Sequence, residues 1–170
     1  MSTPGSPAPS EAAAARGAAD RARARPPVTG DPAFDAVRRA AAGTPALVTA
    51  PDGSPAYWLV PFDLDGRACG VAQVALDASR AGVSALGAGS ADRAAWPDVE
   101  WFARVPAEVL QAVQVRHPGH RWATPRLSYD GSPQRWAWRL DTEPPGALVV
   151  FVSTGGWYER GTPAPAAGER

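Results

Sequence analysis

The apolar residues of this chain are first spaced as in a helix and then as in strands, and this sequence of patterns occurs twice. It predicts two successive regions, each with a helix followed by strands. In the first region Phe34 and Val37 share a helical face, so a helix is expected over residues 32–42 with Asp31 as its N-cap. Alternation of apolar and polar residues then predicts strands at 47–50, 57–62, 68–76 and near 82–86. The segments between them are rich in Asp, Gly and Pro, which is typical of tight turns.

The second region follows the same order. A short helix is expected to start at Pro97, and a longer one over residues 106–116 ends at His117-Pro118-Gly119. Strands are predicted at 123–129, 134–140, 147–152 and 157–160. Each half therefore consists of a helix and then three or four strands, which favours antiparallel pairing.

Two short motifs occur once in each half. Thr-Pro-x-Leu and Asp-Gly-Ser-Pro are found at residues 44–47 and 52–55, and again at 124–127 and 130–133. A tryptophan follows each Asp-Gly-Ser-Pro turn, Trp58 in the first copy and Trp136 in the second. The offset is 124 − 44 = 80 at the first motif and 130 − 52 = 78 at the second. The repetition indicates a duplicated strand–turn–strand unit, with convergence on common turn chemistry as the alternative.

Strand parity assigns the faces of the second hairpin. A turn at residues 130–133 pairs positions whose numbers add to 263, so that Leu127 lies opposite Trp136. One face then carries aromatic side chains, and the other carries Arg126, Arg135 and Arg139. This is the division expected of a half-buried sheet, with the arginines exposed to solvent.

The first hairpin has two apolar faces. If positions whose residue numbers add to 107 are paired, Leu47 and Trp58 lie on one face of this hairpin. Val48, Tyr57 and Leu59 then lie on the other face. A sheet that is apolar on both sides needs a cover on both sides. The second cover is expected to be either the segment that bears Trp96, Trp101 and Phe102 or a second protein molecule.

The ends of the chain differ in composition from its middle. Residues 1–30 are rich in Ala, Pro, Ser, Gly and Arg, and are expected to be a disordered tail with a transient helix over 10–25. Residues 161–170 are expected to be a second tail. Residues 31–160 then form a single compact domain of two pseudo-repeats, 31–86 and 105–160. The predicted fold class is α+β, an antiparallel sheet built from two pseudo-repeated helix-plus-three-strand units with helices on one face.

Charge and cysteine content narrow the classes of function. The formal net charge is zero, which gives no electrostatic support for binding nucleic acid or an acidic membrane. All 17 basic residues are arginine. No apolar run is long enough for a membrane helix or a secretory signal, so the expected location is cytoplasmic. With one cysteine, Cys69, neither an internal disulfide nor a cysteine-based zinc site is expected.

Candidate catalytic and metal-ligating residues are few. Cys69 lies within a predicted strand, so a buried core thiol is favoured over a nucleophile. His117 and His120 flank the end of a helix without a further cluster of ligands, so His117 is interpreted as a helix-end cation rather than a metal ligand. No cofactor is predicted, and no glycine-rich phosphate loop is found.

The sequence therefore favours a non-catalytic binding module that acts through a protein partner or as a homodimer. Its candidate binding residues are the apolar face of the first hairpin and the arginines of the second, namely Val48, Tyr57, Leu59, Arg126, Arg135 and Arg139. Pro61 is expected to mark an edge strand that can accept a partner strand. A small enzyme that uses Cys69 or His117 is one alternative.

The doubled layout over residues 32–160 resembles that of PepSY-type domains, whose members often restrain peptidases. The resemblance lies in the order of the elements and not in a shared motif, so family membership is not inferred from it. It implies, as a further alternative, a peptidase-inhibitor-like or immunity-type protein that neutralises an enzyme partner.

Overall fold

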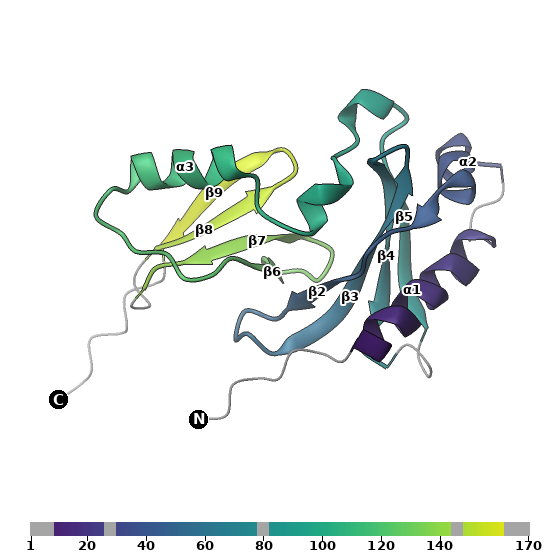
Figure 1. Cartoon of the computed structure of the whole chain (residues 1–170), viewed down its shortest axis with the longest axis horizontal. Coiled ribbons are helices and arrows are strands. Elements are labelled where there is room, and N and C mark those ends of the chain that lie inside the picture. Colours follow the sequence, from purple (N-terminus) through teal and green to yellow (C-terminus); the bar gives the residue numbers. More distant parts are fainter. Residues whose placement is uncertain (1–8, 26–29, 78–81, 144–147, 162–170) are drawn as a thin grey trace. The chain divides into compact units, whose positions relative to one another are not determined.

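The structure is a computed structural model that describes residues 9–25, 30–77, 82–143 and 148–161. It groups the chain into two compact units, Met1–Arg104 and Val105–Arg170. One predicted repeat falls in each unit, and the single domain over 31–160 stays a prediction. Both units combine helices with antiparallel strands, which confirms the α+β class (Figure 1).

In the first unit four strands lie side by side in the order β5-β4-β3-β2, and a short strand, β1, also pairs with β3. All of its pairings are antiparallel. Its elements are α1 (Pro9–Arg23), α2 (Pro32–Arg39), β1 (Ala41–Ala42), β2 (Ala46–Thr49), β3 (Pro55–Leu64), β4 (Arg67–Ala75), β5 (Val83–Ala88) and the 3-10 helices η1 (Arg93–Ala95) and η2 (Val99–Phe102).

Helix α2 begins where the sequence predicts it to begin. The Asp31 side chain accepts a hydrogen bond from the backbone N–H of Ala33 at 2.9 Å, and Pro32 occupies the first helical position. The helix ends at Arg39, earlier than predicted, because Ala41 and Ala42 pair with Asp63 and Phe62 of β3. Backbone hydrogen bonds to a strand replace those of a last helical turn.

Helix α1 covers residues 9–23, where the sequence predicts a transient helix over 10–25 within a tail, and this helix is packed against the first unit. Ala15 and Ala19 are fully buried in the core of the first unit, together with Ala18. The Arg23 guanidinium at its end donates to the carbonyl of Arg38 in α2 at 2.9 Å. Residues 1–8, 26–29 and 162–170 of the predicted tails lie outside the described residues.

The core of the first unit lies between these two helices and one face of the sheet. Trp58, Val60 and Phe62 of β3 contribute to it, as does Val37 of α2. Figure 1 shows α1 and α2 on the same side of β3, β4 and β5. The predicted face of Leu47 and Trp58 is therefore the helix-covered face.

Proline 61 does not mark an edge strand, contrary to the prediction. It lies in β3, which pairs with β4 on one side and with β2 and β1 on the other. The pairing with β2 stops at Leu59 and the pairing with β1 starts at Phe62, so Pro61 falls between the two ladders. On that side the Pro61 carbonyl still accepts from the Gly43 N–H at 2.8 Å, so the only backbone group missing there is the N–H that proline lacks.

The second unit consists of α3 (Ala107–Arg116) and a four-stranded antiparallel run in the order β6-β7-β8-β9. The strands are β6 (Arg126–Tyr129), β7 (Trp136–Asp141), β8 (Leu148–Ser153) and β9 (Gly156–Gly161). The end of α3 is attached to β9, because the Arg116 Nε lies 2.9 Å from a carboxylate oxygen of Glu159. Glu159 shares its face of the strands with Leu140 and Val150, which are buried.

Both hairpins differ from the predicted registers by two residues. In the first hairpin Leu47 lies opposite Trp58, so paired residue numbers add to 105 instead of 107. In the second hairpin Leu127 lies opposite Trp138, so they add to 265 instead of 263. A shift by two preserves the face of every side chain, so the predicted parity is retained. Each unit thus has a Leu–Trp cross-strand pair, and the two pairs are separated by 127 − 47 = 80 residues. A true duplication stays a prediction.

Among the described residues, no helix is long and apolar enough to cross a membrane.

Candidate functional site

One side of β6–β9, here called the arginine face, carries Arg126, Arg139 and Arg160. Pairing across the four strands brings Arg126, Arg139, Phe151 and Tyr158 into one row, and the next row contains Asp141, Val149 and Arg160. The Phe151 and Tyr158 rings are stacked with centroids 5.6 Å apart. The Arg139 guanidinium carbon lies 5.9 Å from the centroid of Phe151. Cationic and aromatic groups are therefore held side by side on rigid strands.

Asp141 bridges the two arginines at the centre of this face. Arg126 and Arg139 are directly opposite each other, and like charges in that position repel. One Asp141 oxygen lies 2.8 Å from Arg139 Nη2, and the other lies 3.2 Å from Arg126 Nη2. Arg139 also donates from Nε to Asp141 at 2.9 Å. The shared carboxylate offsets the repulsion and fixes the orientation of both guanidiniums.

A second carboxylate, Asp130, organises the rest of the arginine face. It is 4% exposed, accepts a hydrogen bond from the Tyr158 hydroxyl at 2.9 Å and lies 2.8 Å from Arg160 Nη2. Burial raises the pKa of the Tyr158 phenol, and its hydrogen bond to Asp130 raises that pKa further. Tyr158 therefore remains a neutral donor, and Arg160 keeps 54% of its side chain exposed above a buried anion.

The two Asp-Gly-Ser-Pro turns differ in what their aspartates bind. Asp52 stabilises its own turn, because its carboxylate accepts from the Ser54 N–H at 2.9 Å and the Ser54 hydroxyl at 2.7 Å. Asp130 instead contacts the distant strand β9. Similar sequence motifs thus have a local role in one unit and a role in the arginine face in the other.

Of the three predicted arginines, the structure brings two together. Arg126 and Arg139 lie opposite each other on the strands. Arg135 lies outside the strands, in the turn between β6 and β7, where its N–H donates to the Ser132 carbonyl at 2.8 Å. The predicted register placed Arg135 within the strand, and the longer turn explains the difference.

The apolar candidates of the first hairpin are not available as an exposed surface. Val48 and Leu59 are fully buried, and Tyr57 is 8% exposed. The 3-10 helix η2, which carries Trp101 and Phe102, contacts β3. Because these side chains are buried, Val48, Tyr57 and Leu59 are a poor fit for a binding surface.

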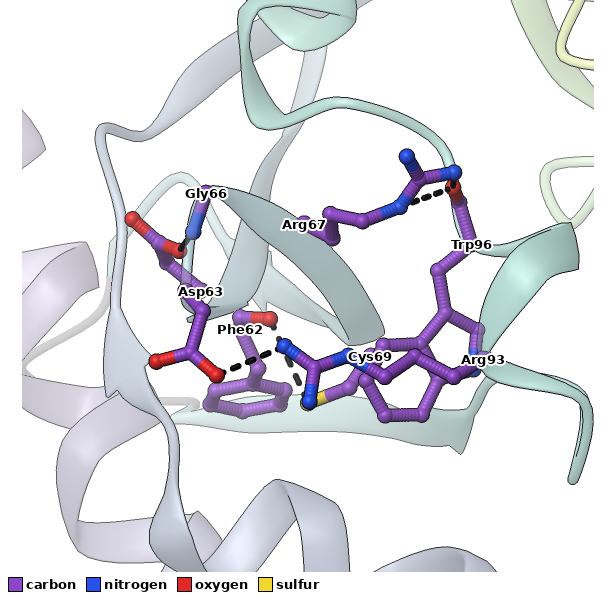
Figure 2. A network of polar contacts seen from close by, with 8 residues as sticks. Phe62, Asp63, Gly66, Arg67, Cys69, Arg93 and Trp96 are labelled. Atoms are coloured by element: carbon purple, nitrogen blue, oxygen red, sulfur yellow. Dashed lines mark hydrogen bonds and ion pairs between the residues drawn. The ribbon is translucent and has the colours of Figure 1, made fainter.

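The surroundings of Cys69 are those of a structural thiol (Figure 2). Its sulfur donates to the Phe62 carbonyl at 3.3 Å, and burial raises the pKa of the thiol. Close by, Arg67 donates from Nε to the Trp96 carbonyl at 3.0 Å, and the Asp63 carboxylate accepts from the Gly66 N–H at 2.8 Å. The first of these two bonds attaches the segment after β5 to the start of β4, and the second closes the β3–β4 turn. Burial leaves Cys69 largely as thiol and without exposure to solvent.

His117 and His120 lie at the C-terminal end of α3, beside an open depression of about 480 Å³. His117 Nε2 is 3.1 Å from Glu159, and the two imidazole centroids are 5.7 Å apart. Hydrogen bonds from Arg116 and His117 lower the pKa of Glu159, that from Arg116 having the larger effect. In the part of the chain that the structure describes, no group of three or more His, Cys, Asp or Glu residues is arranged to hold a metal ion.

Sequence reasoning missed five members of the arginine face, namely Asp130, Asp141, Phe151, Tyr158 and Arg160. Strand parity contains the signal for Asp141, because it follows Arg139 by two residues and must share its face. Asp130 was concealed by its turn motif, whose aspartate usually has a local role.

The comparisons with known proteins give no relative: no family model matches this chain, and neither a curated protein nor a solved structure is significantly similar to it.

Proposed function

We propose that this protein is a non-catalytic binding module whose arginine face binds an acidic segment of a partner protein. The observation that carries the proposal is the cross-strand pair of Arg126 and Arg139, with Arg160 in the neighbouring row. Three arginines against two aspartates give this face a net charge of 3 − 2 = +1 in a chain whose formal net charge is zero. Positive charge is thus concentrated where the partner is expected to bind.

The chemistry of the face fits carboxylates. A guanidinium presents several donors in one plane, which suits a carboxylate. Asp141 and Asp130 already hold the arginines in that arrangement, so little side-chain entropy is lost when a ligand binds. Tyr158, which is partly exposed and stacks on the buried Phe151 ring, provides an apolar contact beside the charges, and tyrosine and arginine are typical of interface centres.

The alternatives have less support. The buried Cys69 thiol with its raised pKa is a weak nucleophile, and His117 already contacts Glu159. A small enzyme using either residue is therefore not favoured. A peptidase-inhibitor-like or immunity-type role is a special case of the proposal, since it requires a protein surface of this kind. It stays a prediction.

The proposal is tested with a fluorescent ten-residue peptide of alternating Glu and Gly, which presents carboxylates on one face of an extended chain. Fluorescence anisotropy at about 0.1 M salt measures its affinity, with the corresponding Lys–Gly peptide as the charge control. The double variant Arg139→Gln/Arg160→Gln is expected to weaken Glu–Gly binding at least tenfold. Arg104→Gln removes an exposed arginine that pairs with Glu100 in the first unit, and it is expected to change the affinity less than twofold.

Equal binding of the two peptides, or no loss of affinity in the double variant, would contradict the proposal. Circular dichroism of each variant establishes that the fold is intact, so that a loss of binding reports on the surface.

We also propose that the two units derive from one duplicated unit. The support is the recurrence of a Leu–Trp cross-strand pair 80 residues apart, at Leu47–Trp58 and Leu127–Trp138.

A further inference from the structure

Among the described residues, strand β5 of the first unit pairs with β4 alone, and strand β9 of the second unit pairs with β8 alone, so each has one unpaired edge. Natural proteins protect such edges with charged residues, proline or bulges, because an unpaired strand edge can bind another strand. Strand β9 follows this rule, since it carries Glu159 and Arg160. Strand β5 reads Val-Ser-Ala-Leu-Gly-Ala and has neither a charge nor a proline. A register shift protects only its start, because Val83 and Ala85 lie opposite Val74 and Gln73 and leave Ser84 as an extra residue.

The register of β5 against β4 determines which residues of β5 direct their backbone N–H and C=O groups away from β4. The Gly89 N–H donates to the Cys69 carbonyl at 2.7 Å, and the pairing continues through Gly87 opposite Val71 and Ala85 opposite Gln73. Antiparallel pairs alternate between hydrogen-bonded and non-hydrogen-bonded. The residues between them, Leu86 and Ala88, therefore direct their N–H and C=O groups to the outer edge. Among the described residues, no strand pairs with that edge.

We infer that the outer edge of β5 pairs antiparallel with β5 of a second copy of this chain, about a two-fold axis at Gly87. This inference is independent of the proposed function. In this register Leu86 is opposite Ala88 of the second copy, so four intermolecular backbone hydrogen bonds form. The bulged Ser84 stays outside the paired segment.

The residues of the segment suit a second copy better than a charged partner strand. Self-pairing of an uncharged strand places no like charges opposite each other, and cyclic two-fold dimers are the commonest oligomers. Gly87 is exposed, and a Cβ built on it would have no heavy atom within 4 Å. Two copies can therefore approach closely at the axis. The interface is small, so the dimer is expected to dissociate on dilution.

The inference is tested by multi-angle light scattering after size exclusion, at loading concentrations between about 1 and about 100 µM, where a small interface dissociates. The expected mass rises from that of the 17.7 kDa chain toward twice that value. Gly87→Lys places two ammonium groups opposite each other and is expected to weaken the dimer at least tenfold. Arg139→Gln/Arg160→Gln leaves it unchanged, so a failure here is distinct from a failure of the proposed peptide binding.

Cysteine cross-linking tests the register. A non-hydrogen-bonded pair has Cα atoms about 4.5 Å apart, which a disulfide can span. Gly87→Cys is therefore expected to form a disulfide-linked dimer under mild oxidation. Ala85→Cys is not expected to form this disulfide, although residue 85 is exposed on the same face, because it lies opposite Gly89 of the second copy. A monomer at every concentration would overturn the inference. Equal cross-linking of both cysteine variants would overturn it as well.

Discussion

Gly70 of β4 provides the sharpest test of the packing in the first unit. A Cβ on Gly70 would lie 2.5 Å from the Gly87 carbonyl oxygen and 2.9 Å from Val37 Cγ2. The first contact involves backbone of the neighbouring strand, and the second involves a buried side chain of α2. Gly70→Ala therefore requires β5 to separate from β4, and it also requires α2 or the Val37 side chain to move. Gly87→Ala is a matched control in the adjacent strand, because its Cβ enters open space.

The expected size of the effect follows from three contributions. Overpacking a close-packed core costs about 1–3 kcal/mol, and each weakened interstrand hydrogen bond costs about 1 kcal/mol. Replacing glycine by alanine lowers the entropy of the unfolded chain, which offsets about 0.4–1 kcal/mol of this. We therefore expect Gly70→Ala to lower the free energy of unfolding by about 2–3 kcal/mol. Gly87→Ala is expected to leave it unchanged or to raise it by up to about 1 kcal/mol.

Urea denaturation followed by far-ultraviolet circular dichroism measures both values. The protein concentration is kept at about 1 µM, so that self-association does not contribute to the stability. A Gly70→Ala variant within about 0.5 kcal/mol of the wild type would refute the reasoning, because the close approach of β4, β5 and α2 would then not exist.

Three other predictions concern separate parts of the chain. Cys69 should react with a thiol reagent only on unfolding, at a rate that rises with urea, because its thiol is buried and its pKa is raised. Ala19→Arg in α1 should lower the free energy of unfolding by about 2 kcal/mol or more, since an unpaired charge would enter a fully buried position, and urea denaturation measures this. Glu159 should have a pKa below that of an ordinary glutamate in an NMR pH titration, and Arg116→Ala should raise that pKa. Because the pKa is lower in the folded state than in the unfolded state, ionised Glu159 stabilises the fold above the ordinary glutamate pKa. This stabilisation is lost as the pH falls through the folded-state pKa.

The local signals of the sequence predicted the elements well. The N-cap at Asp31 gave the start of α2, and the Asp63–Gly66 turn has the backbone that its residues require, with φ of 55° at Asp65 and 80° at Gly66. Alternation gave the correct faces of both hairpins. These features depend on residues close together in the chain, so they can be read without the tertiary structure.

The registers and the burial of α1 could not be predicted in the same way. In the second hairpin the turn extends to Arg135, whose carbonyl accepts from the Asp130 N–H at 3.0 Å, and Asp130 itself binds residues of β9. That tertiary contact is invisible in the motif. Alanine contributes little apolar area, so the sequence predicts only a transient helix over residues 10–25 within a tail; yet Ala15 and Ala19 lie four residues apart and form a stripe that allows close packing on the sheet.

The small size of these buried side chains has a consequence for the order in which the first unit opens. A helix held by methyl groups loses little hydrophobic free energy when it detaches, so its amides should exchange with deuterium before those of β3 and β4. The partly opened species then exposes the indole of Trp58 and the ring of Phe62 to solvent while the strands remain paired. Such a species is the one from which aggregation would begin, and shielding by a chaperone would be most effective at this step.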